Sequence, residues 1–170
     1  LGPIFFNVYT REIPYVAGQA LSLQFADDIG LTCSKPTKSE VSAILSASAS
    51  AIANWLNDRG LILNASKSQV ISISGNLPEK HTPLSVNCNG TLLPLVESAR
   101  YLGVTFDSNM SWDDHVTRCA NRVSRKIGVL WRMRRCLSTQ GRITYFQSII
   151  MPDLLYGSNA FSTSLAARHC

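Results

Sequence analysis

Two adjacent aspartates, Asp27 and Asp28, are the residues of this sequence whose types and spacing most clearly suit chemistry. Apolar and polar residues alternate on both sides of them, over residues 21–25 and 29–33, and this alternation predicts two short β-strands. Because so few residues separate the strands, they should form a β-hairpin that carries both aspartates at its tip. Solvated turn residues would explain such a pair, but the apolar flanks favour a tip at the edge of a packed sheet.

Neighbouring carboxylates repel each other, and this repulsion favours a bound cation. A divalent ion would relieve the repulsion, and hard oxygen ligands of this kind prefer Mg²⁺. A hairpin built on a sheet would hold the two carboxylates rigidly. The pattern therefore predicts that the hairpin tip binds a metal ion.

Two helices are predicted on either side of this hairpin. Residues 4–9 are typical of the apolar end of a helix, which we expect to stop near Pro14. Thr37 and Glu40 form a capping box for a second, longer helix, and Gly60 is its expected C-cap. The small Ala and Ser residues of this second helix would let it lie close against a sheet.

Further strands are predicted after the second helix. Residues 70–73 should form a strand and residues 75–83 a loop. Residues 85–93 should form a hairpin with an Asn-Gly turn. Residues 99–106 resemble another strand, broken by Gly103, and residues 107–109 should turn the chain.

The sequence after residue 110 predicts helices only. Ser111 and Asp114 form a second capping box at the start of a long amphipathic helix. Ser138 can cap a further helix, which we expect Pro152 to end. The order of elements is therefore mixed α/β up to about residue 110 and all-α after it.

Charge divides the chain at nearly the same place. The formal net charge is +5; residues 1–114 carry −3, and residues 115–170, in which Asp153 is the one acidic residue, carry +8. A basic C-terminal third indicates a polyanionic partner, most simply nucleic acid. A solvated, arginine-rich helix face would explain the same charge equally well.

Length and composition bound the class of protein. A chain of 170 residues that is 45% hydrophobic suits one globular domain, or a piece of a larger one. It begins with an apolar run at Leu1, so we expect it to start inside a folded element. We find no signal segment and no membrane span, and we expect an intracellular protein. Five cysteines without a C-x-x-C pair should be reduced thiols that mostly fill the core, in preference to a zinc site: Cys33, Cys88, Cys119, Cys136 and Cys170.

Four segments in family order resemble reverse transcriptases of non-LTR (LINE-type) retrotransposons. The segment Phe25-Ala26-Asp27-Asp28 resembles their aromatic-x-Asp-Asp signature. Upstream, residues 1–9 resemble the motif B helix. Downstream, residues 60–68 resemble motif D, and residues 101–107 resemble the motif E "YLG" region, followed by a Trp and a His at the start of the thumb. The resemblance covers essentially the whole chain.

The resemblance implies an α+β fold and a reaction. Residues 1–110 would be a partial polymerase palm (motifs B to E), an antiparallel sheet with packed helices, and residues 111–170 a helical, thumb-like segment. The parent would be an RNA-directed DNA polymerase that uses two Mg²⁺ ions for nucleotidyl transfer. Asp27 would be a metal ligand and Asp28 its supporting neighbour. The implied partners are an RNA template, a DNA primer, the RNA–DNA duplex and deoxynucleoside triphosphates.

The resemblance also assigns roles to residues outside the aspartate pair. Lys67 would protonate the leaving pyrophosphate or contact the triphosphate, although it could equally be a solvated loop lysine. The residues expected at the nucleotide pocket, with the aromatic ring beneath the primer end, are Gly2, Pro3 and Phe25. The residues expected to form the primer grip, for which an ordinary β-bulge is the alternative, are Tyr101, Leu102 and Gly103.

Arginines on the predicted long helix recur at steps of four, three and seven, which places them in one stripe. A stripe of this kind would contact the phosphates of a duplex without reading its sequence, and its members are Arg118, Arg122, Arg125 and Arg132. A solvated face remains the alternative. We expect His115 to be structural, and we expect the three tryptophans to lie in the core: Trp55, Trp112 and Trp131.

A further metal-binding aspartate belongs to motif A, upstream of motif B in the family order, and the fingers lie upstream too. We therefore expect this stretch alone to be inactive. An intron maturase-type or other cellular reverse transcriptase is one alternative, which the Tyr-Leu-Gly segment with the following Trp and His disfavours. A degenerate or domesticated remnant that binds nucleic acid without catalysis is another, and the intact aspartate pair argues against it.

Overall fold

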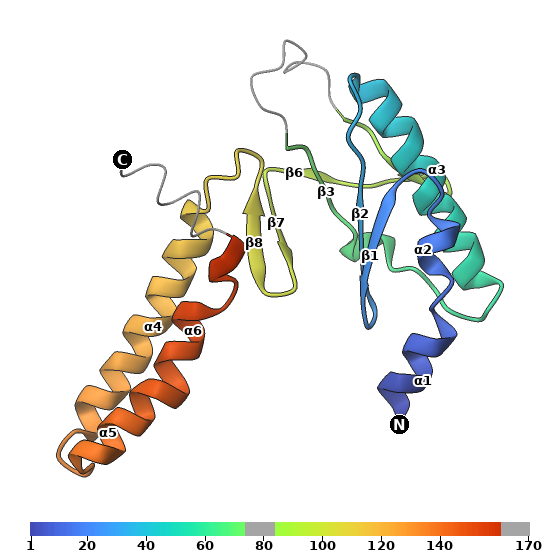
Figure 1. Cartoon of the computed structure of the whole chain (residues 1–170). Helices are drawn as coiled ribbons and strands as arrows, with labels where there is room; N and C mark the ends of the chain where they lie inside the picture. Colours follow the sequence, from blue (N-terminus) through green and yellow to red (C-terminus); the bar gives the residue numbers. More distant parts are fainter. Residues whose placement is uncertain (74–83, 161–170) are drawn as a thin grey trace. The chain divides into compact units, whose positions relative to one another are not determined.

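The computed structural model describes residues 1–73 and 84–160. The chain divides into two compact units, residues 1–102 (unit 1) and 103–170 (unit 2) (Figure 1). Unit 1 is mixed α/β, and unit 2 is almost entirely helical, so the predicted α+β class is confirmed. The loop predicted over residues 75–83 and the last cysteine, Cys170, lie outside the described residues. No helix in the described ranges is both long enough and apolar enough to cross a membrane.

Unit 1 begins with two short helices and the predicted hairpin. Helix α1 (Gly2–Tyr9) ends well before Pro14, so the predicted stop near this proline is wrong. Pro14 instead lies in the first turn of α2 (Ile13–Val16), where a helix does not use the missing N–H. Strands β1 (Leu21–Phe25) and β2 (Asp28–Thr32) follow and pair antiparallel.

Helix α3 (Lys38–Asn57) is the central element of unit 1. The Thr37 hydroxyl accepts a hydrogen bond from the backbone N–H of Glu40 (3.3 Å), as the capping box predicts. At the other end Gly60 has a φ of +74°. The N–H groups of Gly60 and Leu61 donate to the carbonyls of Asn57 and Leu56, which is a Schellman motif. Local sequence signals thus correctly predict both ends of this helix.

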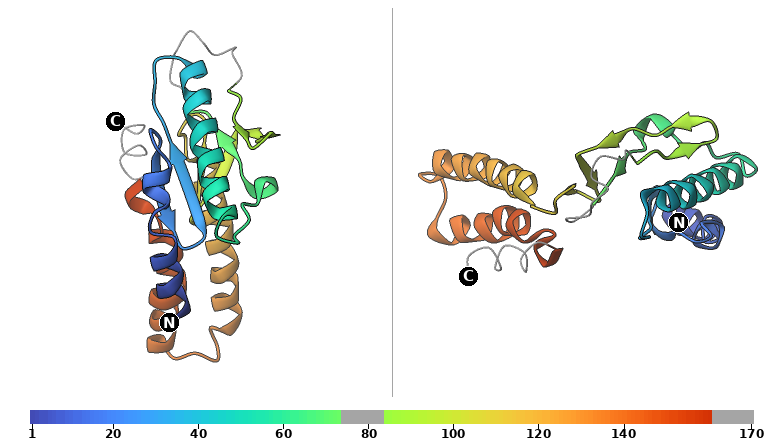
Figure 2. Two further views of the ribbon diagram at one scale, coloured as in Figure 1. Left: turned by 90° about the vertical axis from the view of Figure 1, so that its right-hand side faces the viewer. Right: turned by 90° about the horizontal axis from the view of Figure 1, so that it is seen from above.

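Two apolar clusters use α3. Ile52 and Leu56 pack against Ile13 of α2 and against Ala17, the residue that follows α2. One turn earlier, Ala49 packs against buried residues in and beside the strands that follow, among them Val70 and Cys88. The helix therefore joins α2 and the β1–β2 hairpin to the rest of unit 1 (Figure 2).

A ladder of serines holds α3 to the extended chain around β4 (Asn87–Cys88). The hydroxyls of Ser42, Ser46 and Ser50 accept hydrogen bonds from three backbone N–H groups, at 3.2, 2.9 and 3.1 Å, and these donors are Ser85, Asn87 and Asn89. Every fourth helical residue thus meets every second residue of the strand. The small side chains bring helix and strand close together, as the Ala/Ser-rich run predicts.

The remaining strands of unit 1 are short. Strand β3 (Val70–Ile71) pairs in parallel with β6 (Leu95–Val96). Strand β4 pairs antiparallel with β5 (Thr91–Leu92) across Asn89 and Gly90, whose positive φ angles of 47° and 85° confirm the Asn-Gly turn. A 3₁₀ turn (Ala65–Lys67) precedes β3.

The strand predicted over residues 99–106 is two strands, β7 (Ser98–Tyr101) and β8 (Val104–Asp107). Leu102 and Gly103 separate them, with φ angles of 48° and 81°. Two successive residues with positive φ make a tight turn where the sequence alone predicts an interruption. The division between the two units falls inside this turn.

Unit 2 is organised around helix α4 (Asp113–Met133), and its start differs from the prediction. The Asp107 carboxylate accepts hydrogen bonds from the backbone N–H groups of Asn109, Ser111 and Trp112 at 3.0, 2.8 and 2.7 Å. These bonds turn the chain so that Trp112, with a φ of 67°, is the N-cap residue. The predicted Ser111–Asp114 capping box is therefore wrong.

Two further contacts fix α4 within unit 2. His115 is buried, and its Nδ1 atom accepts a hydrogen bond from the backbone N–H of Thr105 in β8 (3.3 Å), which fits the structural role predicted for it. Asp153 lies 2.6 Å from the Lys126 ammonium and 3.2 Å from the Arg122 guanidinium. The Lys126 hydrogen bond and the nearby Arg122 charge hold the pKa of Asp153 below its usual range.

The second arm of unit 2 runs through Pro152 instead of ending there. Ser138 caps α5 (Thr139–Tyr145), as predicted, by accepting from the Gly141 N–H at 3.1 Å. A π-helical turn (Phe146–Ile150) and α6 (Met151–Leu155) continue the arm. The expected stop at Pro152 is wrong, because the wide π-turn just before the proline accommodates its missing N–H and its ring.

Replacing Asp107 with Ala should destabilise the chain, because three backbone N–H groups at the start of α4 lose their acceptor. Burial opposes ionisation of Asp107, but the hydrogen bonds from Ser111 and Trp112 outweigh it and lower the pKa. We expect a loss of about 1–3 kcal/mol in the free energy of unfolding, measured by urea denaturation at neutral pH.

A lowered folded-state pKa means that this contribution is present above the unfolded pKa of about 4 and is lost as the pH falls through the folded pKa. The difference in free energy of unfolding between the Asp107→Ala variant and the parent chain should therefore become smaller at acidic pH. Glu97→Ala, at an exposed site, is the control and should change stability little. A gap that stays constant down to about pH 3 would contradict a role for the carboxylate charge.

Candidate active site

The β1–β2 hairpin carries the candidate site. Its register pairs Leu21 with Thr32 and continues to Phe25 opposite Asp28. The connection is therefore Ala26 and Asp27 alone, and Ala26 takes a φ of +52°. The predicted hairpin is confirmed, with one refinement: Asp27 lies in the turn, whereas Asp28 is the first residue of β2.

Both aspartates are exposed at this tip. Carboxylates at an exposed tip are accessible to a hydrated cation, and two of them can supply part of a divalent-ion site. In the ranges 1–73 and 84–160, no three His, Cys, Asp or Glu side chains gather closely enough to hold a metal ion. Within the described residues the pair therefore does not complete a metal site by itself.

Gln24 braces the turn from the side of β1 that is turned inward. Its side-chain amide donates to the Ala26 carbonyl at 3.1 Å and to the Thr10 hydroxyl at 2.6 Å. Thr10, just after α1, is buried and donates in turn to the Phe6 carbonyl. The hairpin tip and α1 consequently lie at the same end of unit 1 (Figure 1).

The apolar side of β1 faces outward. Leu21, Leu23 and Phe25 are each more than half exposed, whereas the alternating Ser22 and Gln24 are partly covered. The predicted alternation of apolar and polar residues is thus present in β1. However, the polar face of the strand is the one that other described residues cover, and the apolar face is exposed.

Tyr101 lies over the middle of the hairpin. Its hydroxyl donates to the Leu23 carbonyl at 3.3 Å, and a Cβ atom placed on Gly30 would lie 3.3 Å from the Tyr101 ring. Leu23 and Gly30 are cross-strand partners, so the tyrosine covers one rung of the hairpin. Burial raises the pKa of Tyr101, and the negative charge of Asp28 raises it further.

Gly30 was not among the predicted site residues. A glycine inside a strand often marks the close approach of another group, so the sequence did carry a signal for it. The structure thus places Phe25, Asp27, Asp28 and Tyr101 on or against one hairpin. Their catalytic and primer-binding roles stay predictions.

The other predicted site residues are more dispersed. Lys67 is exposed in the 3₁₀ turn, and its backbone N–H donates to the Asn64 side chain at 3.3 Å. Gly2 lines a shallow hollow along α1, whose other lining residues do not include Pro3 or Phe25. Gly103 approaches Tyr156, since a Cβ atom there would lie 3.1 Å from its ring.

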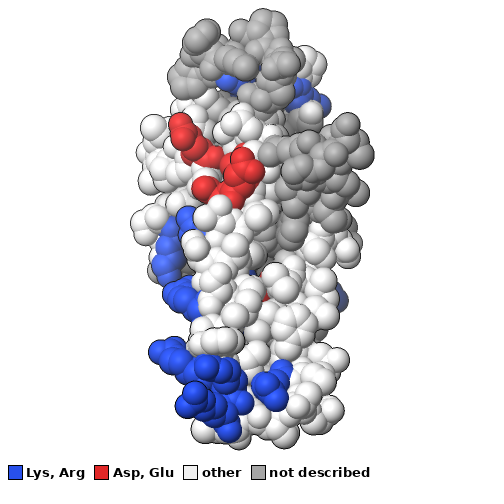
Figure 3. All heavy atoms as spheres, turned by 90° about the vertical axis from the view of Figure 1, so that its left-hand side faces the viewer, with Lys and Arg blue, Asp and Glu red and all other residues white. Residues whose placement is uncertain are grey.

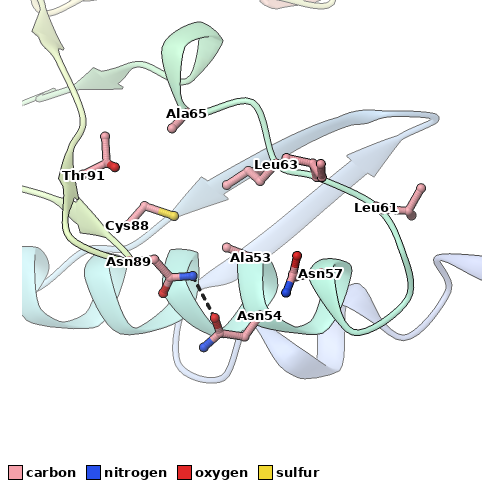
Figure 4. Close-up of a pocket in the computed structure, with 10 residues that line it drawn as sticks. Ala53, Asn54, Asn57, Leu61, Leu63, Ala65, Cys88, Asn89 and Thr91 are labelled. Carbon is pink, nitrogen blue, oxygen red and sulfur yellow. Dashed lines mark hydrogen bonds between the residues drawn. The ribbon is translucent and has the colours of Figure 1, made fainter.

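A separate pocket, lined by both apolar and polar residues, lies between α3, residues 61–65 and the β4–β5 hairpin (Figure 4). On its wall Asn89 donates to the Asn54 side chain at 2.7 Å. None of the predicted site residues lines this pocket, and it has no charged side chain.

The predicted arginine stripe divides into two groups. Arg118, Arg125 and Arg132 are exposed on α4, where basic side chains follow the helical unit (Figure 3). Arg122 is half-buried and pairs with Asp153, so the ion pair explains its position without a phosphate. Asp153 is the one acid in a basic segment, which was a signal for this pairing.

Of the four described cysteines, only Cys88 is buried in the core, so the prediction that the five cysteines mostly fill the core is wrong. Cys33 and Cys119 are partly exposed and Cys136 is exposed, and all four are free thiols.

An α+β unit with an aspartate pair on a hairpin, followed by a basic helical unit, is compatible with part of a nucleic-acid polymerase. Comparison with known families agrees: the family described as reverse transcriptase (RNA-dependent DNA polymerase) matches residues 1–106. The chain belongs to the reverse transcriptase family.

Similar proteins come from mobile elements of insects. The chain is 25% identical to the probable RNA-directed DNA polymerase from transposon X-element of Drosophila melanogaster, over 92% of this chain and 18% of that protein. It is 24% identical to the RNA-directed DNA polymerase from mobile element jockey of Drosophila funebris, over 99% of this chain and 19% of that protein. The chain thus spans under a fifth of these relatives. No solved structure matches it significantly.

The contact between Gly30 and Tyr101 can be tested by a double-mutant cycle. Gly30→Val should displace the tyrosine ring and lower the free energy of unfolding by about 1–3 kcal/mol, as overpacking does. In a Tyr101→Ala background the same valine should be tolerated, because the space above residue 30 is open. Urea denaturation of the four proteins gives the coupling energy. Equal effects of the valine in both backgrounds would contradict the contact.

Proposed function

We propose that this chain is part of an RNA-directed DNA polymerase encoded by a non-LTR retrotransposon, and that the β1–β2 hairpin supplies one of its metal-binding carboxylates. The observation that carries the proposal is the exposed Asp27 in a two-residue turn, within the part of the chain that matches the reverse transcriptase family. Substrates would be deoxynucleoside triphosphates and a DNA primer on an RNA template, inside the cell.

Asp27 and Asp28 would hold Mg²⁺ together with a carboxylate from elsewhere in the parent protein. When bound, the two ions of such a site activate the attacking 3′-hydroxyl and neutralise the triphosphate. The chain's own contribution is to position the ligands. Gln24 and Tyr101 brace the hairpin on two sides, so the turn keeps one position while substrates change.

The residues that we propose near the nucleotide are Lys67, Gly2, Pro3 and Phe25. For the Leu102–Gly103 turn we propose a contact with the primer. For the duplex backbone we propose the exposed Arg118, Arg125 and Arg132. Arg122 is left out, because its charge is already matched by Asp153.

Replacing Asp27 with Asn in the full-length parent should abolish primer extension, because the amide cannot carry the negative charge that a divalent ion requires. Binding of the RNA template should change less than twofold. Asp58→Asn, at an exposed site after α3, is the matched control and should extend primers normally. Extension by the Asp27→Asn enzyme at the parent rate would end the metal-ligand proposal. Template binding without extension by the unaltered parent would favour the nucleic-acid-binding remnant.

The two kinds of arginine on α4 should differ in their response to salt. Arg125→Ala should weaken binding to an RNA–DNA duplex and reduce the slope of log K against log salt by about one unit. Arg122→Ala should leave the slope unchanged but lower stability, because it leaves Asp153 with one cationic partner instead of two. Fluorescence anisotropy at several salt concentrations measures both slopes. A smaller slope for Arg122→Ala would place that residue on phosphate after all.

A further inference from the structure

Trp131, near the end of α4, was expected in the core, but 65% of its surface is exposed. Trp112, at the start of the same helix, is buried, and Trp55 in unit 1 is partly buried against an apolar cluster. An indole ring exposed to this degree contributes little to folding. Its exposure calls for another explanation.

Arg134 holds the Trp131 ring in place. Its guanidinium lies 3.8 Å from the ring centroid, and the same group donates to the Trp131 backbone carbonyl at 2.9 Å. One face of the ring is thus covered by a cation whose own position is fixed by a hydrogen bond. The large exposed fraction that remains leaves the ring open to a second planar group.

The surroundings of this pair are strongly basic. Arg132 and Arg135 are exposed beside it, and Arg142 is exposed on α5, where it donates to the Thr139 hydroxyl. No carboxylate in the described part of unit 2 forms an ion pair with any of these arginines. Figure 3 shows basic side chains gathered at the end of the unit where α4 leads into α5, without acidic ones among them. We call Trp131, Arg132, Arg134 and Arg135 the tip cluster.

Among the described residues an arginine stacks on a tryptophan at one other place, and an acidic residue lies beside that stack. Arg59 lies 3.9 Å over the ring of Trp55, but it also forms an ion pair with Glu12 at 3.1 Å. That pair is neutralised and partly packed, as a structural contact is. The tip cluster has the same stack, but its ring is open and its arginines form no ion pair with the described acids.

We propose that the tip cluster binds single-stranded nucleic acid, with a base stacked on Trp131 and phosphates on the surrounding arginines. An aromatic ring among basic residues is the combination that binds unpaired strands, because every base has a π-face and every nucleotide a phosphate. A duplex cannot use the ring, since its bases are already stacked. The inference rests on the proposed function in assuming that unit 2 meets nucleic acid.

The test compares single-stranded and duplex binding by the 170-residue chain. Fluorescence anisotropy measures the Kd for a labelled 12-nucleotide oligouridine and for an RNA–DNA duplex. Trp131→Ala should raise the single-strand Kd about five- to a hundredfold, and the duplex Kd less than twofold. Trp131→Phe, which keeps a ring, should retain most of the affinity. Circular dichroism should show the same melting temperature for all variants, because Trp131 is exposed.

Charge variants complete the experiment. Arg135→Ala should weaken oligouridine binding, whereas Lys35→Ala, which removes an exposed charge in unit 1, should not. Equal effects of Trp131→Ala on both ligands, or no effect on either, would overturn the proposal. So would polyglutamate that binds through Trp131 as tightly as RNA, because this outcome would assign the cluster to an acidic protein. The assay contains neither metal nor nucleotide, so its outcome is independent of the Asp27→Asn extension test.

Discussion

The pairing of Leu23 with Gly30 is the contact on which the candidate site depends. Gly30 has no side chain, so the Tyr101 ring can lie over this rung and donate to the Leu23 carbonyl. One residue further along β1, Gln24 braces the turn that carries Asp27. A slip of one residue in this register would turn every side chain to the opposite face and place a side chain beneath the ring. The position of the carboxylates is therefore set by packing several residues away.

Elements whose signals lie within a few residues of one another could be predicted. The alternation around the aspartates, the Thr37 cap and the Asn89-Gly90 turn each depend on local backbone geometry, and each is present. The predictions failed where a distant or unusual partner decided the outcome. Asp107 accepts from the Ser111 N–H, which the predicted capping box would have paired with the Asp114 side chain. The π-turn lets the chain continue through Pro152.

The candidate site shows the same division. The aspartate pair could be found because both strands and turn lie in one short stretch of sequence. For Tyr101 over Gly30 and Arg122 beside Asp153 the sequence held only hints, a glycine inside a strand and a single acid in a basic segment. Neither hint names the partner, because each contact joins residues far apart in the chain. Charge alone could not separate the arginines either. Helical spacing puts all four in one stripe, but only packing against α6 shows that Arg122 already has a partner.

The serine ladder between α3 and β4 ends at Asn89, where the chain turns, and the spacings of helix and strand would limit a longer one. Four helical residues rise about 6 Å, whereas two strand residues advance about 6.6–6.8 Å. The two spacings therefore differ slightly at each rung, and the difference accumulates along the ladder. The three rungs are 3.2, 2.9 and 3.1 Å long, so all of them stay within hydrogen-bond range. One turn beyond the last rung stands Asn54, whose longer side chain accepts from the side chain of Asn89. Serine hydroxyls on a helix can therefore reach the N–H groups of a neighbouring strand for only a few turns. Beyond that, longer side chains must span the accumulated difference in spacing.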